Sequence, residues 1–425
     1  MSKLKGKKLL ILGGSANEIS LVERAKAMGV YTIVTDYYTD HEISPAKKIA
    51  DEYWDDSWSD LDVLEKKCRD AGVDGIVAGY SEFRVENQIK LCQRLNLPCY
   101  CTMEQLDITR DKRKFKDACI ASGVPVIHEY GSVEEVTKYP VIVKPVDRGG
   151  SIGISVATNR QELESAYAYA MEMSVVKDVI IEDYIGDATK IDVYYEIIDG
   201  ESILLTSDDT INAKNNGFSK VVQSCWLLPS RQHDVIVEKA DKALRRLLKN
   251  MGIQNGYIFI SGFVDDRGNV AFFETGFRLC GGHLYDYFEQ IGYPNNLDLF
   301  IHHALTGDCT SLLAEERSRK ESDLKCVTLN FYANKGEIAF ISDMEKLRLE
   351  DACAFTLTTA HVGQVCTDDK AILSKIGMVH LFGADPSELK KTADNIYQSV
   401  EVRDIDGNDL IYDRIDTTQI EKWWR

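Results

Sequence analysis

The sequence predicts an α/β domain followed by an α+β body and a smaller α+β unit near the end of the chain. Residues 1–105 alternate short apolar runs with amphipathic stretches, which is typical of a parallel, doubly wound sheet. From about Leu106 short β-type runs follow one another closely, which indicates antiparallel pairing. A last group of strands and one helix begins at about Cys326. No Pro-rich or low-complexity linker separates these regions, so we expect them to pack as one body.

The elements of the first region follow in chain order. Residues 7–12 and 31–36 are apolar runs that we expect to be buried strands, and 75–80 is expected to be the third strand. The stretch 13–29 is expected to hold a turn and a helix, and 84–96 a further helix. Parallel strands need such crossover helices, so this order predicts the doubly wound sheet.

The glycines after the first strand raise a separate possibility. Gly13 and Gly14 stand before a helix N-terminus, where a phosphate can bind. Asp36 closes the second strand, as the ribose-binding acid does in nicotinamide-dependent enzymes. The sequence G-G-S-A-N-E does not match G-x-G-x-x-G. We therefore interpret the glycines as a tight turn, and an oxidoreductase is the alternative that rests on them.

The middle region is expected to open with a helix that starts at Asp107 or Thr109 and ends near Gly123. A longer helix is expected at 234–251, and a hairpin at 256–274, because Asp-Asp-Arg-Gly-Asn supplies turn residues between two apolar runs. The other expected strands are 140–145, 153–157, 179–185, 191–198, 201–208 and 220–228. The last region is expected to contain strands within 327–341 and 378–385 and a helix at 386–400.

Composition limits the partners and the cellular location. The 425 residues include 50 Lys and Arg against 68 Asp and Glu, a net charge of -18. This balance argues against nucleic acid and anionic membranes as partners, since both bind basic surfaces. No apolar run reaches the about 18 residues of a membrane span, and the short run LLILGG is interpreted as a strand rather than a secretion signal. The 11 cysteines form no C-x-x-C pair, which indicates a reducing cytoplasm.

The segment VIVKPVDRGGSIGI, residues 141–154, combines a strand lysine with a loop of small residues. Lys144 ends an apolar strand, where a charge is not buried without a partner. The loop contains Arg148 and glycines, whose backbone N–H groups can approach phosphate oxygens closely. The loop joins two strands and lacks G-x-x-x-x-G-K-[ST], so it is not a Walker loop. By itself the segment fits a plain hairpin equally well.

Further motifs occur in a fixed order around this segment. The Asp-Lys pair at 111–112 precedes Lys144, and VIIEDYIG (179–186), Lys220 and FFETGFRLCGGH (272–283) follow it. In this order and spacing they resemble the ATP-grasp superfamily, specifically its biotin carboxylase-like and carbamoyl-phosphate synthase-like branch. The resemblance covers nearly the whole chain and includes the segment SKIGMVHLFGADPSELKKTADNI near its end.

The resemblance implies a division of the chain into domains. Residues 1–105 would form the pre-ATP-grasp, Rossmann-like domain with the parallel sheet. Residues 106–320 would form the ATP-grasp core, with a lid subdomain at about 140–205. Residues 321–425 would form the small C-terminal α+β lobe.

The resemblance also implies roles for individual residues. Lys112 and Lys144 would hold the ATP phosphates, which meets the demand of phosphoryl transfer for positive charge. Lys220 and Arg278 would face the acyl phosphate and the substrate carboxylate, and Glu274 would hold Mg²⁺. The other residues implied to bind ATP form the lid loop, the adenine-reading hinge and a position near the ribose: Arg148, Gly149, Gly150, Ser151 and Gly153; Glu182, Asp183, Tyr184 and Ile185; Lys190.

The sequence departs from the family at the metal site. By its usual spacing the first metal-binding Glu of the family falls on Gly262, and the Asn of Glu-x-Asn-x-Arg falls on Gly276. Mg²⁺ would then be held by Glu274, phosphates and water, or a nearby acid such as Asp265 or Asp266 would substitute.

These residues predict an ATP-dependent ligase that joins a carboxylate to an amine, or to a thiol, through an acyl phosphate and releases ADP and phosphate. The expected cofactors are ATP and Mg²⁺, with Mn²⁺ as an alternative ion, and the expected partners are small-molecule carboxylates and amines. Because relatives often dimerise, a homodimer is one expected assembly. The missing metal ligands leave a non-catalytic, regulatory ATP-binding protein as the alternative. His283 is interpreted as structural, with a general base as the other option.

Overall fold

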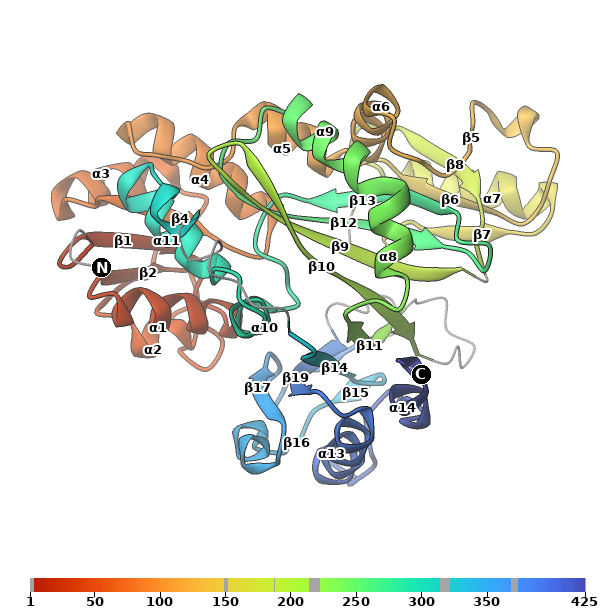
Figure 1. Ribbon diagram of the computed structural model, residues 1–425. Coiled ribbons are helices and arrows are strands. Elements are labelled where there is room, and N and C mark those ends of the chain that lie inside the picture. The colour runs from red at the N-terminus through yellow and green to blue at the C-terminus, as the bar shows by residue number, and fades with distance from the viewer. Residues whose placement is uncertain are drawn as a thin grey trace.

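The computed structural model of the protein describes residues 4–148, 152–186, 188–213, 222–313, 322–367 and 374–424. Figure 1 shows a parallel sheet at one end, a large antiparallel sheet in the centre, a small sheet at the other end and a C-terminal lobe beside the centre. The predicted fold class, a parallel N-terminal sheet followed by an antiparallel-rich α+β body, is confirmed.

The N-terminal sheet has the strand order β3-β2-β1-β4, and all its neighbours pair in parallel. Helices cover both of its faces, α1 and α2 on one and α3 and α4 on the other (Figure 1). Its strands are β1 (Lys8–Leu12), β2 (Tyr31–Thr35), β3 (Glu52–Trp54) and β4 (Gly75–Ala78), and its helices are α1 (Ile19–Ala27), α2 (Ala46–Ile49), α3 (Leu61–Ala71) and α4 (Glu82–Leu95). The three-residue edge strand β3 was not predicted, because it is too short to show a hydrophobic period.

The helix expected after residue 106 is two helices, α5 (Met103–Arg110) and α6 (Lys112–Ser122). They separate at Asp111, whose backbone is extended and whose carboxylate accepts hydrogen bonds from the first turn of α6. Such an N-cap satisfies backbone N–H groups that have no partner within the helix. Lys112 is therefore the first residue of α6, at a fixed place rather than in a loop.

The small sheet has the order β5-β8-β6-β7, and α7 packs on it over its own apolar core. Its elements are β5 (Glu129–Tyr130), β6 (Val141–Pro145), β7 (Ser155–Ala157), α7 (Arg160–Met173) and β8 (Val179–Asp183). Sequence reasoning did not predict α7, which begins at the capping residue Asn159. The expected lid range of about 140–205 also contains β9 (Thr189–Ile198) and the beginning of β10 (Glu201–Asn212), and both strands belong to the central sheet.

The central sheet has eight strands in the order β13-β12-β9-β10-β11-β14-β19-β17. Every pair of neighbours in it is antiparallel. Its strands are β9 (Thr189–Ile198), β10 (Glu201–Asn212), β11 (Gln223–Leu228), β12 (Gly256–Val264), β13 (Val270–Gly276), β14 (Lys325–Tyr332), β17 (Cys353–Thr358) and β19 (Lys375–Gly383). The sheet therefore runs without a break from the hairpin that carries Glu274 into the C-terminal lobe.

Helices and small strands complete the central region and the lobe. The long predicted helix is α8 (His233–Ile236), a π-helical turn and then α9 (Lys242–Asn250). The remaining helices are α10 (Tyr285–Gln290), α11 (Asn296–Thr306), α13 (Pro386–Ser399) and α14 (Thr418–Trp423), and the remaining strands are β15 (Gly336–Glu337), β16 (Phe340–Ile341), β18 (Val365–Cys366) and β20 (Val402–Arg403). None of the helices within the described ranges is both long and apolar enough to cross a membrane.

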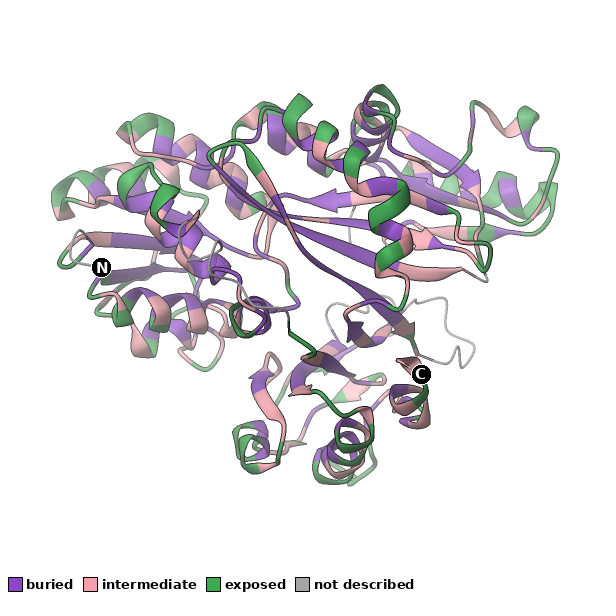
Figure 2. Cartoon of the chain, in the orientation of Figure 1, coloured by how far each residue is buried: buried purple, intermediate pink, exposed green. Residues whose placement is uncertain are grey.

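One continuous core joins the N-terminal sheet to the central sheet, as the buried strands in Figure 2 show. Helix α11 comes late in the chain but packs on the N-terminal sheet, where Lys7 donates to the Leu305 carbonyl at 2.5 Å. Arg24 on α1 forms an ion pair with Asp298 on α11 at 2.5 Å. These contacts fix the N-terminal sheet against the centre of the molecule.

The lobe contains a buried histidine, His380, between the rings of Phe355 and Phe382. Its protonation makes the stability of the fold depend on pH. The His380 ring lies 4.7 Å from that of Phe355, and burial together with the nearby Lys375 lowers the pKa of His380 to about 3. Between a pH of about 6.5 and 3 the unfolded chain binds a proton at this position and the folded chain does not. His380 alone should therefore lower the free energy of unfolding by about 1.4 kcal/mol for each pH unit below 6.5.

We expect His380→Phe to flatten this dependence, because phenylalanine keeps the ring stack and cannot bind the proton. Urea unfolding at pH 7, 6 and 5 measures the slope for the native and variant chains. His361→Phe, at a partly exposed position, is the matched control. Equal slopes for the native chain and His380→Phe would contradict the assignment.

Candidate active site

The candidate site lies where the small sheet, α6 and the β12–β13 hairpin meet. Lys112 begins α6 and is 7% exposed. Its ammonium donates to the Arg148 carbonyl and lies 3.9 Å from the Glu274 carboxylate. Burial lowers the pKa of Lys112, and Glu274 opposes that shift. A buried lysine beside a partly exposed carboxylate is a group that an anionic ligand would stabilise.

Lys144, at the end of β6, is 4% exposed and forms an ion pair of 2.5 Å with Glu182 on β8. Its ammonium also lies 5.2 Å from the ring centre of Phe273, so it contacts the β12–β13 hairpin as well as the small sheet. Lys116, one helical turn after Lys112, forms a second ion pair with Glu182 and donates to the Ile127 carbonyl at 3.0 Å. Sequence reasoning missed Lys116, although its spacing from Lys112 places both on one face of α6.

The loop after β6 lies partly within the described residues. Arg148 donates from Nε to the Met173 carbonyl at 2.7 Å, so its guanidinium is held at the end of α7. Gly153 has a φ of 77°, and a Cβ there would lie 2.6 Å from a Pro145 carbon, so only glycine fits. The predicted ligands Gly149, Gly150 and Ser151 lie outside the described residues, and so does Lys220.

The predicted adenine hinge, Glu182 to Ile185, begins in the last two residues of β8 and continues past its end. Glu182 is buried in the two ion pairs described above, so its carboxylate points toward Lys116 and Lys144. These two lysines and Lys112 are called the lysine cluster below. Asp183 accepts from the Tyr130 hydroxyl at 2.7 Å. The N–H of Tyr184 donates to the Pro140 carbonyl at 3.3 Å, and its side chain is exposed. Ile185 follows in a segment without regular secondary structure.

Arg278 is placed by a contact with the first residue of α4, which packs on the N-terminal sheet. Its Nε donates to the Glu82 carboxylate at 2.7 Å, and its guanidinium lies 5.2 Å from the ring centre of Phe259. Burial alone would lower the pKa of Arg278, but Glu82 together with Cys280 and Tyr100 outweighs that effect and the pKa is raised. Glu82 was not predicted as a site residue, because 196 positions separate it from Arg278 and no local pattern links them.

His283 is a structural residue in this fold, as the sequence interpretation proposed. Its φ is 51°, and its ring stacks on Tyr80 with centres 4.6 Å apart. Nε2 donates to the Asn17 side-chain oxygen at 3.0 Å, and Nδ1 pairs with the Tyr285 hydroxyl at 3.2 Å. Burial lowers the pKa of His283 well below its usual value, so the ring stays neutral. With both nitrogens engaged, His283 ties the loop to the N-terminal sheet.

The hairpin register places Ser261 as well as Gly262 near the expected metal position. A bulge at Phe273 shifts the hairpin register, so Ser261, not Gly262, lies opposite Glu274. A Cβ on Gly262 would lie 2.7 Å from the Ala271 carbonyl oxygen, toward the core. A Cβ on Gly276 would lie 2.3 Å from the Phe259 ring. An aromatic ring therefore fills the space in which a side chain at 276 would lie.

The Phe259 ring leaves no space for a side chain at position 276, which can be tested by substitution. We expect Gly276→Asn to lower the free energy of unfolding by about 1–3 kcal/mol, because the new side chain cannot fit beside the ring. Adding Phe259→Ala should recover part of that loss, which urea unfolding of the single and double variants would measure. A Gly276→Asn chain as stable as the native one would show that the ring moves aside freely.

Acidic residues continue across the central sheet from Glu274. Asp192 on β9 pairs in register with Ser261 and with Asp208 on β10, so these side chains form a row (the acidic row: Glu274, Ser261, Asp192 and Asp208). Lys190 joins it through an ion pair of 2.7 Å with Asp192. Burial and the neighbouring Asp192 raise the pKa of Asp208 well above its usual value.

Other predicted candidates lie away from this site. Asp265 accepts from the backbone of Arg267 and Asn269 and so builds the β12–β13 turn, and the neighbouring Asp266 is exposed in that turn. Within the described ranges no group of three or more His, Cys, Asp or Glu side chains is arranged to hold a metal ion.

Side chains of the protein occupy the space beside Gly13 and Gly14. A Cβ on Gly13 would lie 2.4 Å from the Arg84 guanidinium, and one on Gly14 would lie 2.0 Å from the Ser44 hydroxyl. The Asp36 carboxylate accepts from the Gly14 N–H at 2.9 Å. These contacts favour the tight-turn interpretation over a dinucleotide site.

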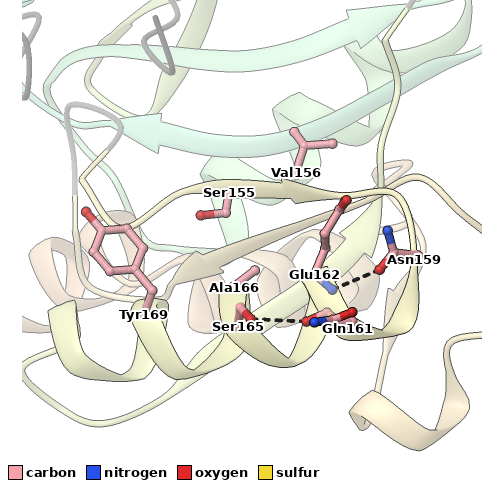
Figure 3. Close-up of a pocket in the computed structure, with 8 residues that line it drawn as sticks. All are labelled: Ser155, Val156, Asn159, Gln161, Glu162, Ser165, Ala166 and Tyr169. Carbon is pink, nitrogen blue, oxygen red and sulfur yellow. Dashed lines mark hydrogen bonds between the residues drawn. The ribbon is translucent and has the colours of Figure 1, made fainter.

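A shallow pocket lies elsewhere, between β7 and the start of α7 (Figure 3). Its lining includes Ser155 and Val156 from the strand and Tyr169 from the helix. The dashed contacts in Figure 3 are the cap from the Glu162 N–H to Asn159 and the bond from the Ser165 hydroxyl to the Gln161 carbonyl within α7. None of the predicted site residues lines this pocket, so it does not coincide with the lysine cluster.

Comparisons with known proteins agree with the motifs. The family model "D-ala D-ala ligase C-terminus" matches residues 104–221. A D-alanine–D-alanine ligase of Fusobacterium nucleatum is 28% identical over 173 residues, which cover 40% of this chain and 56% of the relative. The aligned part is thus little more than half of that relative. The region that the family model matches contains Lys112, Lys116 and Lys144.

Solved structures extend the likeness to the whole fold. An L-amino acid ligase from Bacillus licheniformis superposes with a TM-score of 0.74 at 18% identity, covering 94% of this chain and 99% of the other. A biotin carboxylase from Campylobacter jejuni superposes with a TM-score of 0.74 at 18% identity, covering 99% and 96%. The predicted resemblance to the ATP-grasp superfamily is confirmed to this extent: a ligase family model matches residues 104–221, and the fold matches that of a ligase and a biotin carboxylase over nearly the whole chain.

Proposed function

We propose that the protein is an ATP-dependent ligase that joins a small carboxylate to an amine through an acyl phosphate and releases ADP and phosphate. The observation that carries the proposal is the convergence of Lys112, Lys144 and the Glu274 hairpin from separate parts of the chain. Arg278 is joined to this group through Glu82, a carboxylate that it binds and whose charge also acts on Lys112. Phosphoryl transfer needs mainly charge neutralisation and positioning, which such a cluster supplies. The D-alanine and L-amino acid ligases among the similar proteins favour an amine over a thiol as the nucleophile.

Each proposed role follows from a position described above. Lys112 and Lys144 would bind phosphate oxygens, because their ammonium groups are buried between the small sheet and the hairpin. Glu274 would hold Mg²⁺ together with those oxygens, and Mn²⁺ could replace it; the ion would neutralise phosphate charge. Arg278 would bind the substrate carboxylate through its guanidinium, whose fork matches two carboxylate oxygens.

The remaining residues assigned from the motifs complete the nucleotide site. The backbone around Asp183, Tyr184 and Ile185 would bind the adenine edge, and the loop from Arg148 to Gly153 would cover the phosphates. Lys220 would face the acyl phosphate beside Arg278. We further propose that the protein acts in the cytoplasm on small molecules, alone or as a homodimer.

The test is release of ADP and phosphate. Purified protein with ATP and Mg²⁺ should release both only when a carboxylate and an amine substrate are present, in a screen of amino acids and dipeptides. The alternative, a non-catalytic ATP-binding protein, is favoured by the Phe259 ring beside Gly276. Tight ATP binding with no ADP release from any substrate pair would support that alternative and overturn the ligase proposal.

A further inference from the structure

The acidic row of the central sheet is paired with a lysine of the same chain, Lys190. We propose that Lys190 supplies, from the protein, the positive charge that a second divalent ion would bring to this row, so that the nucleotide-bound protein takes a single divalent ion, at Glu274. The inference rests on the proposed nucleotide site and adds how the negative charge of the acidic row is balanced. It is tested by counting bound ions, which needs no catalytic activity.

The contacts of Asp192 are the first support. Its Oδ2 accepts from the Lys190 ammonium at 2.7 Å, and its Oδ1 accepts from the Ser261 hydroxyl. Asp192 is 8% exposed, so both carboxylate oxygens are held by the protein in a buried place. A divalent ion would have to displace the ammonium before it could bind these oxygens.

Both carboxylate oxygens of Asp208 are likewise held by hydrogen bonds within the protein. Its Oδ1 accepts from the Asp192 backbone N–H at 3.0 Å, and its Oδ2 accepts from the Tyr194 hydroxyl. It is 0% exposed and so has no free edge toward the nucleotide side of the sheet. The row therefore offers a second ion no open carboxylate beyond Glu274 among the described residues.

Glu274 differs from both aspartates. Its side chain is 41% exposed, and its carboxylate lies 3.9 Å from the Lys112 ammonium, beyond hydrogen-bonding distance. Lys190 is close enough for Glu274 to raise the pKa of that lysine, together with Asp192 and Asp208. One carboxylate is thus open to an ion, while the rest of the row is neutralised by a lysine whose side chain is 11% exposed.

Ion counting tests the proposal directly. The protein is saturated with β,γ-imido-ATP, which is not hydrolysed, and titrated with Mn²⁺ while electron paramagnetic resonance measures the free ion. We expect one bound Mn²⁺ per chain. Lys190→Met keeps the length of the side chain and removes its charge, and should raise the count to two because Asp192 becomes open. Lys190→Arg is the matched control and should keep the count at one.

The outcomes separate this inference from the proposed function. Two bound ions in the native chain would overturn the inference, and so would a count of one in a folded Lys190→Met chain. If Lys190→Met does not fold, as judged by circular dichroism, the native count and that of Asp192→Asn decide. Asp192→Asn should leave one tightly bound ion, and loss of that ion would show Asp192 to be a ligand. Failure to bind the nucleotide at all would overturn the proposed function and this inference with it.

Discussion

Lys144→Ala is expected to lower the rate of ADP release by on the order of 10²-fold or more, because a preorganised cation at the phosphates is lost in a site that excludes water. The ammonium is 4% exposed and lies between Glu182 and the ring of Phe273, so no water or neighbouring side chain can take its place without rearrangement. The measurement is steady-state ADP release under the substrate pair found in the screen.

The control for this variant is Lys138→Ala, an exposed lysine just before the same strand, which should keep full activity. Removing Lys144 leaves Glu182 paired with Lys116, so the carboxylate keeps one partner and we expect the fold to persist. Circular dichroism and nucleotide binding check that the chain is folded. A folded Lys144→Ala chain with native activity would contradict the assignment of this lysine to the phosphates.

Arg278→Ala is expected to lower activity by about 10²-fold while leaving binding of β,γ-imido-ATP unchanged, because the guanidinium is assigned to the carboxylate and not to the nucleotide. Arg278→Lys should be nearly as impaired, since an ammonium cannot bind two carboxylate oxygens in one plane. Activity is measured as ADP release, and nucleotide affinity by calorimetry.

The matched control is Arg267→Ala, in the exposed turn of the same hairpin. Arg278 also pairs with Glu82, so its loss removes a link between the hairpin loop and the N-terminal sheet. Thermal unfolding separates that structural effect from the loss of activity. Weaker nucleotide binding with unchanged dependence on the carboxylate would place Arg278 at the phosphates instead.

The sequence allowed the strands, the order of the regions and the ATP-grasp motifs to be predicted, because these depend on short-range patterns. Lys144 at a strand end and Lys112 after a capping aspartate are both local features. The pairing of Lys116 with Glu182 and of Arg278 with Glu82 could not be predicted, since each joins segments far apart in the chain. Such pairs are fixed only when the sheets pack.

Strand register adds information about the metal side that the sequence does not contain. Counting residues placed a ligand position at Gly262, but the bulge at Phe273 puts Ser261 opposite Glu274. A shift of one residue turns a side chain to the other face of a sheet, so a single inserted residue changes which positions reach the site. Spacing in the sequence cannot show that insertion, because both faces of the hairpin carry apolar residues.

The unbroken central sheet also determines how the molecule can deform. β11 pairs with β14 from Cys225 opposite Leu329 to Leu228 opposite Cys326, across the boundary between the middle of the chain and the lobe. Rotation of the lobe against the centre would break this ladder of backbone hydrogen bonds. The small sheet shares no such ladder with the central sheet within the described residues. We therefore expect the central sheet and the lobe to move as one rigid unit. The small sheet beside Lys112, Lys116 and Lys144 can move separately from them.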